Sequence, residues 1–183
     1  GAVIVAAANN CGLASIPGCA TNPNGKSYPA ASNHVIAVGA LGADNTLAVY
    51  SQHNDAAHGN WVSVAAPGGL CAQASPDTCV FSTWPSSKVC SATKGCYSGP
   101  TGQYAYLQGT SQASPHVAGL AALLFAANPA LTNIQVKQII ESTANRSIAT
   151  GAVTNGLIDA TAAIRAALAN TSPPSSTPVP TLT

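Results

Sequence analysis

A change in the spacing of apolar residues near position 110 constrains the fold of this chain most. Before it, apolar residues form short continuous runs, which lie at Ala2–Ala7, His34–Ala40, Trp61–Ala66 and Val80–Ser82. Such runs between loops rich in Gly, Pro, Asn and Ser are typical of buried strands. After it, the i, i+3, i+4, i+7 spacing of one helix face is met by Val117, Leu120, Ala121 and Leu124. Strands followed by helices predict an α/β domain.

Two further helices are predicted downstream. Asn128-Pro129 ends the first helix, and Thr132 begins a second one with Gln135 in the position of a capping box. A third helical pattern covers residues 157–168. After it, residues 171–183 are rich in Pro, Ser and Thr and cannot bury a core. We therefore expect one domain over residues 1–170 and a linker or tail over 171–183.

The composition excludes several classes of protein. Apolar residues make up 46% of the chain and charged residues only 6%, which is the reverse of a disordered sequence. The net charge is +1, and the six Lys and Arg residues are scattered. Neither a nucleic-acid footprint nor a polybasic membrane patch is present. The apolar run at the start is too short to span a bilayer.

Six cysteines lie in three close pairs, which are Cys11 and Cys19, Cys71 and Cys79, and Cys90 and Cys96. Their spacings lack the CxxC pattern of zinc sites. An even number in local pairs within loops predicts three disulfides and an oxidising compartment. Free buried thiols are the alternative.

The segment Gly109–Gly119 places a serine at the start of the first helix, just after a glycine that allows a tight turn. There the Ser111 hydroxyl is exposed, and the free N–H groups of the helix start favour negative charge. Acyl transfer needs this arrangement, because the serine attacks a carbonyl and its N–H can hold the oxyanion. Taken alone, Ser111 could equally be an N-cap.

Gly109–Gly119 resembles the nucleophile motif of the subtilisin family, G-T-S-x-A-x-P-H-V-A-G, at every fixed position. Ala6–Gly12 resembles that family's A-A-A-G-N-x-G, in which the Asn donates to the oxyanion, and Asn10 falls on that Asn. Asn9 stands where the family has Gly. The G-x-S-x-G elbow of esterases and lipases fits worse, because Ala113 replaces its second glycine. The resemblance implies a subtilisin-like α/β domain with a mostly parallel sheet flanked by helices.

The resemblance also implies where a peptide would bind. The segments Tyr28-Pro-Ala30, Val35–Ala40 and Ala66-Pro-Gly68 resemble the family in the expected order. They place Ser27 at the base of the S1 pocket, and a cis peptide bond is expected between Tyr28 and Pro29. The residues assigned to substrate binding are Ala7, Ala8 and Asn9 along one wall of this pocket, and Thr110 beside the expected nucleophile.

The acid and the base of the family's triad are absent from this chain. Neither D-[ST]-G nor H-G-T-H-V-A-G occurs in it, and His34, His53 and His58 are expected to be structural or solvated. His116 follows Ser111 by five residues, about 140° around the helix, so we expect it to pack rather than to act as the base. The missing groups would lie either before Gly1 on the same product or on a separate chain after a nick.

The expected function is therefore a secreted serine endopeptidase that forms an acyl-enzyme on Ser111, with Asn10 as an oxyanion donor. Its partners would be protein or peptide substrates and the upstream part of the same catalytic domain. The rival is a non-catalytic processed fragment or pseudo-enzyme. The sequence identifies no cofactor with certainty, and calcium is possible. Calcium is left open by the resemblance, although the five carboxylates form no cluster. A weak cation site would use backbone carbonyls of Ala30, Ser32 and Val35.

Overall fold

The computed structural model describes residues 1–71, 78–85, 96–99 and 102–170 of the chain. Its central sheet is parallel, with the strand order β1-β2-β3. These strands span Ile4–Ala7, Val35–Leu41 and Val64–Pro67. All three overlap the predicted runs, with ends shifted by up to three residues. Strand β2 is buried along its whole length, as expected for the middle strand of a parallel sheet.

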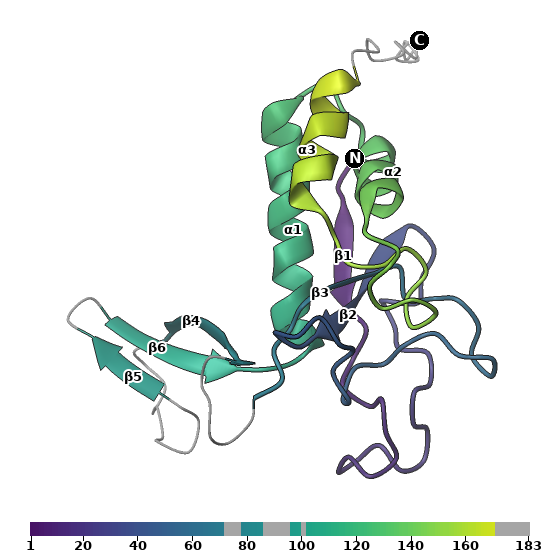
Figure 1. Cartoon of the computed structure of the whole chain (residues 1–183), viewed down its shortest axis with the longest axis vertical. Coiled ribbons are helices and arrows are strands. Elements are labelled where there is room, and N and C mark those ends of the chain that lie inside the picture. Colours follow the sequence, from purple (N-terminus) through teal and green to yellow (C-terminus); the bar gives the residue numbers. More distant parts are fainter. Residues whose placement is uncertain (72–77, 86–95, 100–101, 171–183) are drawn as a thin grey trace, which may run out of the picture.

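Three helices cover one face of this sheet (Figure 1). They are α1 at Thr110–Ala127, α2 at Asn133–Thr143 and α3 at Ala160–Ala169. The predicted capping box at Thr132 and Gln135 is present at the start of α2. The main core joins the inward face of α1 to strand β2, with Leu124 and Val38 both fully buried. None of the described helices is long and apolar enough to cross a membrane.

The opposite face of the sheet is covered by loops. A second core lies there, and it includes Val62, Val153 and Leu41. The segment after α2 lies along the outer edge of β3, because Ile158 donates to the Ala65 carbonyl at 3.0 Å. The sheet is therefore buried on both faces, and its C-terminal ends meet the turn that begins α1.

A smaller antiparallel sheet projects from the lower end of α1 (Figure 1). Its order is β4-β6-β5, with strands at Val80–Trp84, Gly102–Leu107 and Cys96–Gly99. We call this sheet the arm. Only β4 was predicted. The ring of Phe81 lies against those of Tyr104 and Tyr106, at centroid distances of 5.2 and 4.6 Å.

Two of the predicted disulfides are confirmed, Cys11–Cys19 and Cys71–Cys79. The third, Cys90–Cys96, involves Cys90, which lies outside the described residues.

Candidate active site

Ser111 lies in the first turn of α1 with an exposed side chain. The turn before it depends on Gly109, whose φ of 150° is rarely adopted by residues with a side chain. The Gly109 amide donates to the Gly68 carbonyl at 2.9 Å. The buried hydroxyl of Tyr50 donates to that carbonyl at 3.0 Å and to the carbonyl of Gly69. The segment directly after β3 therefore holds the turn before Ser111 in place.

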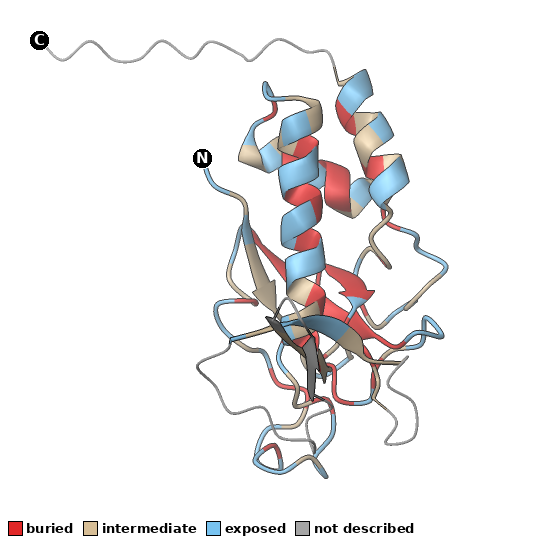
Figure 2. Ribbon diagram, turned by 90° about the vertical axis from the view of Figure 1, so that its left-hand side faces the viewer, coloured by how far each residue is buried: buried red, intermediate tan, exposed pale blue. Residues whose placement is uncertain are grey.

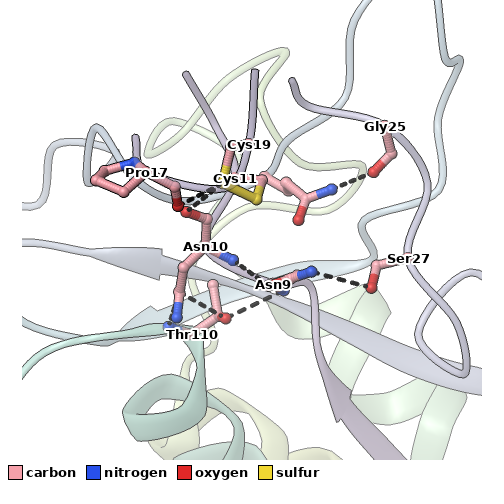
Figure 3. Close-up of a disulfide and its surroundings, with 9 residues drawn as sticks. Asn9, Asn10, Cys11, Pro17, Cys19, Gly25, Ser27 and Thr110 are labelled. Carbon is pink, nitrogen blue, oxygen red and sulfur yellow. Dashed lines mark hydrogen bonds between the residues drawn. A yellow bond between two sulfur atoms is a disulfide. The ribbon is translucent and has the colours of Figure 1, made fainter. Parts of the chain in front are cut away.

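Asn10 lies directly beside this turn, and its two ends have different tasks (Figure 3). The Oδ1 atom accepts from the Thr110 amide at 2.9 Å and from the Thr110 hydroxyl at 3.0 Å. This fixes the side chain so that Nδ2 is left as a donor. A Cβ atom added to Gly109 would lie 2.8 Å from Gln112 Oε1, 3.3 Å from Asn10 Nδ2 and 3.6 Å from the Ser111 amide nitrogen. Both donors therefore lie close to one point above Gly109, and the side-chain oxygen of Gln112 lies near the same point.

Thr110 forms hydrogen bonds with both Asn9 and Asn10. Its hydroxyl donates to Asn10 and accepts from the Asn9 amide at 3.1 Å, and the whole residue is buried. The sequence assigned Thr110 to substrate binding. A residue with no exposed surface and with its hydroxyl used by two neighbours fits a positioning role better than direct contact with a substrate.

Asn9 has a φ of 87°, in the left-handed region that Asn tolerates better than most residues with a side chain. Its Oδ1 accepts from the Asn10 amide at 2.7 Å, and its Nδ2 donates to the Ser27 hydroxyl at 3.4 Å. The Asn9 carbonyl accepts from the Gln52 amide at 3.1 Å. The Asn9 side chain is thus held between Asn10 and Ser27, as Figure 3 shows.

The remaining residues assigned to the substrate pocket lie at the end of β1 and on the loop before β2. Ala7 is half-buried and keeps some surface that a ligand could contact, whereas Ala8 is fully buried and exposes neither its side chain nor its backbone. The peptide bond between Tyr28 and Pro29 is cis, which confirms the expectation. The structure therefore brings Asn9 and Ser27 together at one side of Asn10, next to the end of β1.

The prediction that His116 packs into the protein is wrong for this chain. Its side chain is exposed, and its Nδ1 lies 2.9 Å from the Gln112 carbonyl one turn earlier. It shares a hollow of about 350 Å³ with Ser111, whose other lining residues are Val80, Phe81, Ser82, Gln112 and Pro115. The angle around the helix separates His116 from Ser111. It could not show that the side of α1 that carries His116 is exposed.

One His–Asp pair was not foreseen. In a loop, His58 Nδ1 lies 2.9 Å from Asp55 Oδ1. Asn24 Nδ2 donates to the other carboxylate oxygen, Asp55 Oδ2, at 2.5 Å. The hydrogen bond from His58 is the largest cause that lowers the pKa of Asp55, to about 2. Because Asn24 also accepts from the His53 amide at 2.7 Å, the pair joins two surface loops. Its contacts are structural, as the sequence suggested for His53 and His58.

The carbonyl groups considered for a weak cation site do not favour calcium. The ammonium group of Lys137 lies 3.4 Å from the Val35 carbonyl oxygen and already supplies a positive charge there. A divalent ion on the same carbonyl would repel it. Within the described part of the chain, no group of three or more His, Cys, Asp or Glu side chains could hold a metal ion.

Comparison with known proteins identifies the family of this chain. The model of the Subtilase family matches residues 1–170. Subtilisin BL from Lederbergia lenta is 34% identical over 165 residues, which cover 90% of this chain and 47% of that protein. A solved protease of Pseudoalteromonas arctica PAMC 21717 superposes with a TM-score of 0.70 at 34% identity, over 91% of this chain and 43% of its own. A lanthipeptide protease gives the same TM-score at 25% identity, over 90% of this chain and 50% of its own.

These solved relatives share the arrangement of parallel sheet and helices, so the predicted subtilisin-like fold is confirmed. The chain spans about half the length of the relatives it matches. Together, the matched residues and the shared fold show that the chain belongs to the subtilase family.

Proposed function

We propose that this chain is the nucleophile-bearing part of a serine endopeptidase. The observation that carries the proposal is that Asn10 Nδ2 and the Ser111 amide nitrogen lie close to one point above Gly109, beside an exposed serine. A substrate carbonyl oxygen that displaces Gln112 Oε1 from this point would accept from both donors. Such donors stabilise the charge that develops when a carbonyl becomes tetrahedral.

The reaction follows from this arrangement. Ser111 Oγ attacks the carbonyl carbon of the scissile peptide bond and gives its proton to a base, while the carbonyl oxygen becomes an oxyanion held by Asn10 and Ser111. The intermediate then collapses, the C–N bond breaks, and the base returns the proton to the leaving amine. Water then attacks the carbonyl carbon of the remaining ester and gives a proton to the base. The bond to Ser111 Oγ breaks, the base returns the proton to Oγ, and the acid is released.

The base and its carboxylate partner would come from the upstream part of the same catalytic domain. A serine hydroxyl without a base is a weak nucleophile at neutral pH. Within the described part of the chain, His116 is hydrogen-bonded through Nδ1 to the Gln112 carbonyl and not to Ser111. The relatives are about twice as long as this chain, which leaves room for those groups. The chain alone is therefore expected to be inactive.

Substrates would be proteins or peptides bound in extended form. The side chain preceding the scissile bond would lie beside the end of β1, against Ala7, with Asn9 and Ser27 as a polar floor. The enzyme would work outside the cell. Two disulfides support an oxidising compartment, and the relatives include subtilisins.

The test uses the full-length protein, with its upstream part, and a serine-directed fluorophosphonate. Labelling and peptide hydrolysis should both disappear in Ser111→Ala and survive in Ser114→Ala, a matched change three residues further along α1. A full-length protein that is folded but neither labels nor hydrolyses peptides would support the rival, a pseudo-enzyme or non-catalytic fragment. Hydrolysis of esters but never of peptides would point to an esterase.

A further inference from the structure

We propose that the Cys11–Cys19 disulfide positions the polar floor of the substrate pocket. It holds the segment of residues 11–27, here called the pocket loop, which brings Ser27 to Asn9. In this way it limits the size of the side chain that is accepted before the scissile bond. The claim about substrates rests on the proposed function, whereas the positioning rests on contacts of the pocket loop alone.

The disulfide lies directly beside the backbone of Asn10. Cys11 is the next residue, and the sulfur of the buried Cys19 lies 3.9 Å from the Asn10 carbonyl oxygen. The Cα atoms of the two cysteines are 5.2 Å apart. In Figure 3 the side chain of Asn10 points to Thr110 and away from the disulfide. The chain therefore leaves the site after Asn10 and is joined to the same place again at Cys19.

The segment that the disulfide encloses has few other constraints. Residues 13–18 are exposed apart from Ile16, which is half-buried against the main core. The Ile16 amide donates to the Leu13 carbonyl at 3.2 Å, and the Cys19 amide donates to the Ile16 carbonyl at 3.0 Å, so both bonds stay within the segment. Figure 2 shows that the loops at the lower end of the molecule are largely exposed. The covalent bond is therefore the strongest constraint on where the chain returns.

The carbonyl group of Cys11 provides a second attachment. It accepts from the amide of Asn24 at 2.6 Å, so the returning segment binds the residue that begins the pocket loop. Asn24 is buried, and its φ of 56° lies in the left-handed region that Asn tolerates. The next amide, that of Gly12, donates to the Tyr50 carbonyl at 2.8 Å. The disulfide therefore helps to place the carbonyl that receives Asn24.

Gln52 connects the end of the pocket loop to Asn9. Its amide donates to the Asn9 carbonyl at 3.1 Å, and its side chain donates to the Gly25 carbonyl. Ser27 follows, and its hydroxyl oxygen lies 3.4 Å from Asn9 Nδ2. This distance is at the long limit of a hydrogen bond, so a small shift of the loop would separate the two side chains. The polar floor thus depends on how well the loop is fixed.

A loosened pocket loop would change the polar floor more than the oxyanion donors. Thr110 holds the side chain of Asn10 through Oδ1, and Thr110 belongs to α1 rather than to this loop. The methyl group of an alanine extends little into a pocket, whereas a phenylalanine ring meets its floor. When Asn9 and Ser27 separate, the pocket deepens, so phenylalanine before the scissile bond gains relative to alanine.

The alternative is that the disulfide only stabilises the fold. A disulfide restricts the unfolded chain wherever it lies. Cys71–Cys79 offers a matched control, because its cysteines are also eight residues apart. It lies directly before β4, at the start of the arm, rather than beside Asn9. A purely stabilising role predicts the same consequences for the loss of either disulfide.

The first measurement compares Cys11→Ala/Cys19→Ala with Cys71→Ala/Cys79→Ala in the full-length protein. Both double variants should melt at a lower temperature than the parent. Only the first should raise the ratio of kcat/KM for a phenylalanine peptide to that for an alanine peptide, by at least about three-fold. Its kcat for the alanine peptide should stay within about two-fold of the parent.

The second measurement needs no activity and uses hydrogen exchange of full-length proteins that carry Ser111→Ala. The amide of Asn24, which donates to Cys11, should exchange at least about ten-fold faster once Cys11→Ala/Cys19→Ala is added. The amide of Ala8, which donates to the Val38 carbonyl of β2, should keep its rate.

An unchanged exchange rate at Asn24 would overturn the proposal, because the pocket loop would then be held without the disulfide. Faster exchange with an unchanged or lower ratio of phenylalanine to alanine would also overturn it, as would an equal rise of that ratio in Cys71→Ala/Cys79→Ala. These outcomes are separate from those of the proposed function. A full-length protein that hydrolyses no peptide loses the protease assignment, and exchange at Asn24 then still decides whether the disulfide holds the loop.

Discussion

Asn10 offers a sharp test of the oxyanion site, because its two ends can be changed separately. Asn10→Asp keeps an oxygen to accept the two bonds from Thr110 at 2.9 and 3.0 Å but removes the Nδ2 donor. Loss of one oxyanion donor costs about 2.7–4 kcal/mol, or about 10²–10³ in kcat, a magnitude known from a subtilisin itself. The added carboxylate would also repel the oxyanion, so this is the minimum expected loss.

Asn10→Leu removes both ends. It should lose the same factor in kcat, and it should also destabilise the fold by about 1–3 kcal/mol, because the buried Thr110 amide loses its acceptor. The difference between the two variants therefore separates the catalytic donor from the structural acceptor.

The assay measures kcat, KM and the melting temperature of the full-length variants on the same samples, with a chromogenic peptide as substrate. Asn10→Asp should melt close to the parent and keep its KM while kcat falls, the pattern of an interaction made only in the transition state. A folded Asn10→Asp protein whose kcat stays within about two-fold of the parent would refute the assignment of Asn10.

Other predictions follow from the same contacts. The chain without its upstream part should hydrolyse no peptide, and turnover that is lost in Ser111→Ala would contradict this. Asn9→Gly removes the side chain that reaches Ser27, so it should raise kcat/KM for large residues before the scissile bond relative to alanine. A series of peptides varied at that position measures the ratio, and an unchanged ratio would exclude Asn9 as a specificity determinant. The pKa of Asp55 is about 2 when folded, against an ordinary 3.8, so its carboxylate stabilises the fold above about pH 4 and this contribution is lost as the pH falls toward 2. Asp55→Asn should therefore lower the melting temperature at pH 7 and make little difference at pH 2, and an equal loss at both would disprove the linkage. Peptide mapping without reduction should recover the pairs Cys11–Cys19, Cys71–Cys79 and Cys90–Cys96, and free thiols at all six positions would refute the oxidising compartment.

The position of Ser111 at the start of a helix and the parallel sheet could be predicted because their signals are local. Ser111 follows a glycine and opens an apolar helix, and the short apolar runs marked all three strands of the central sheet. The arm could not be predicted in the same way. In β6, Tyr104, Ala105, Tyr106 and Leu107 show no alternation of polar and apolar residues, because the sheet is held partly by rings stacked on its own face.

The connections within the site also escaped the sequence. Thr110 is separated from Asn9 and Asn10 by about a hundred positions, and only the fold shows that its hydroxyl serves both. His116 was misplaced because an angle around a helix gives a direction but not what covers it. The pair of Asp55 and His58 lies in a loop, where a spacing of three residues carries no information about contact.

Tyr50 sets a limit on how alkaline a medium the nucleophile turn can withstand. Burial raises the pKa of its phenol to about 12, while an open chain would titrate near 10. Its hydroxyl therefore keeps donating to the carbonyls beneath Gly109 across the whole range in which most tyrosines would begin to ionise. Between about pH 10 and 12 the unfolded chain would lose this proton and the folded one would not, so the fold loses stability over that interval. Above about pH 12, the carbonyl oxygens of Gly68 and Gly69 would face a phenolate instead of a donor. The turn before Ser111 would then lose this support.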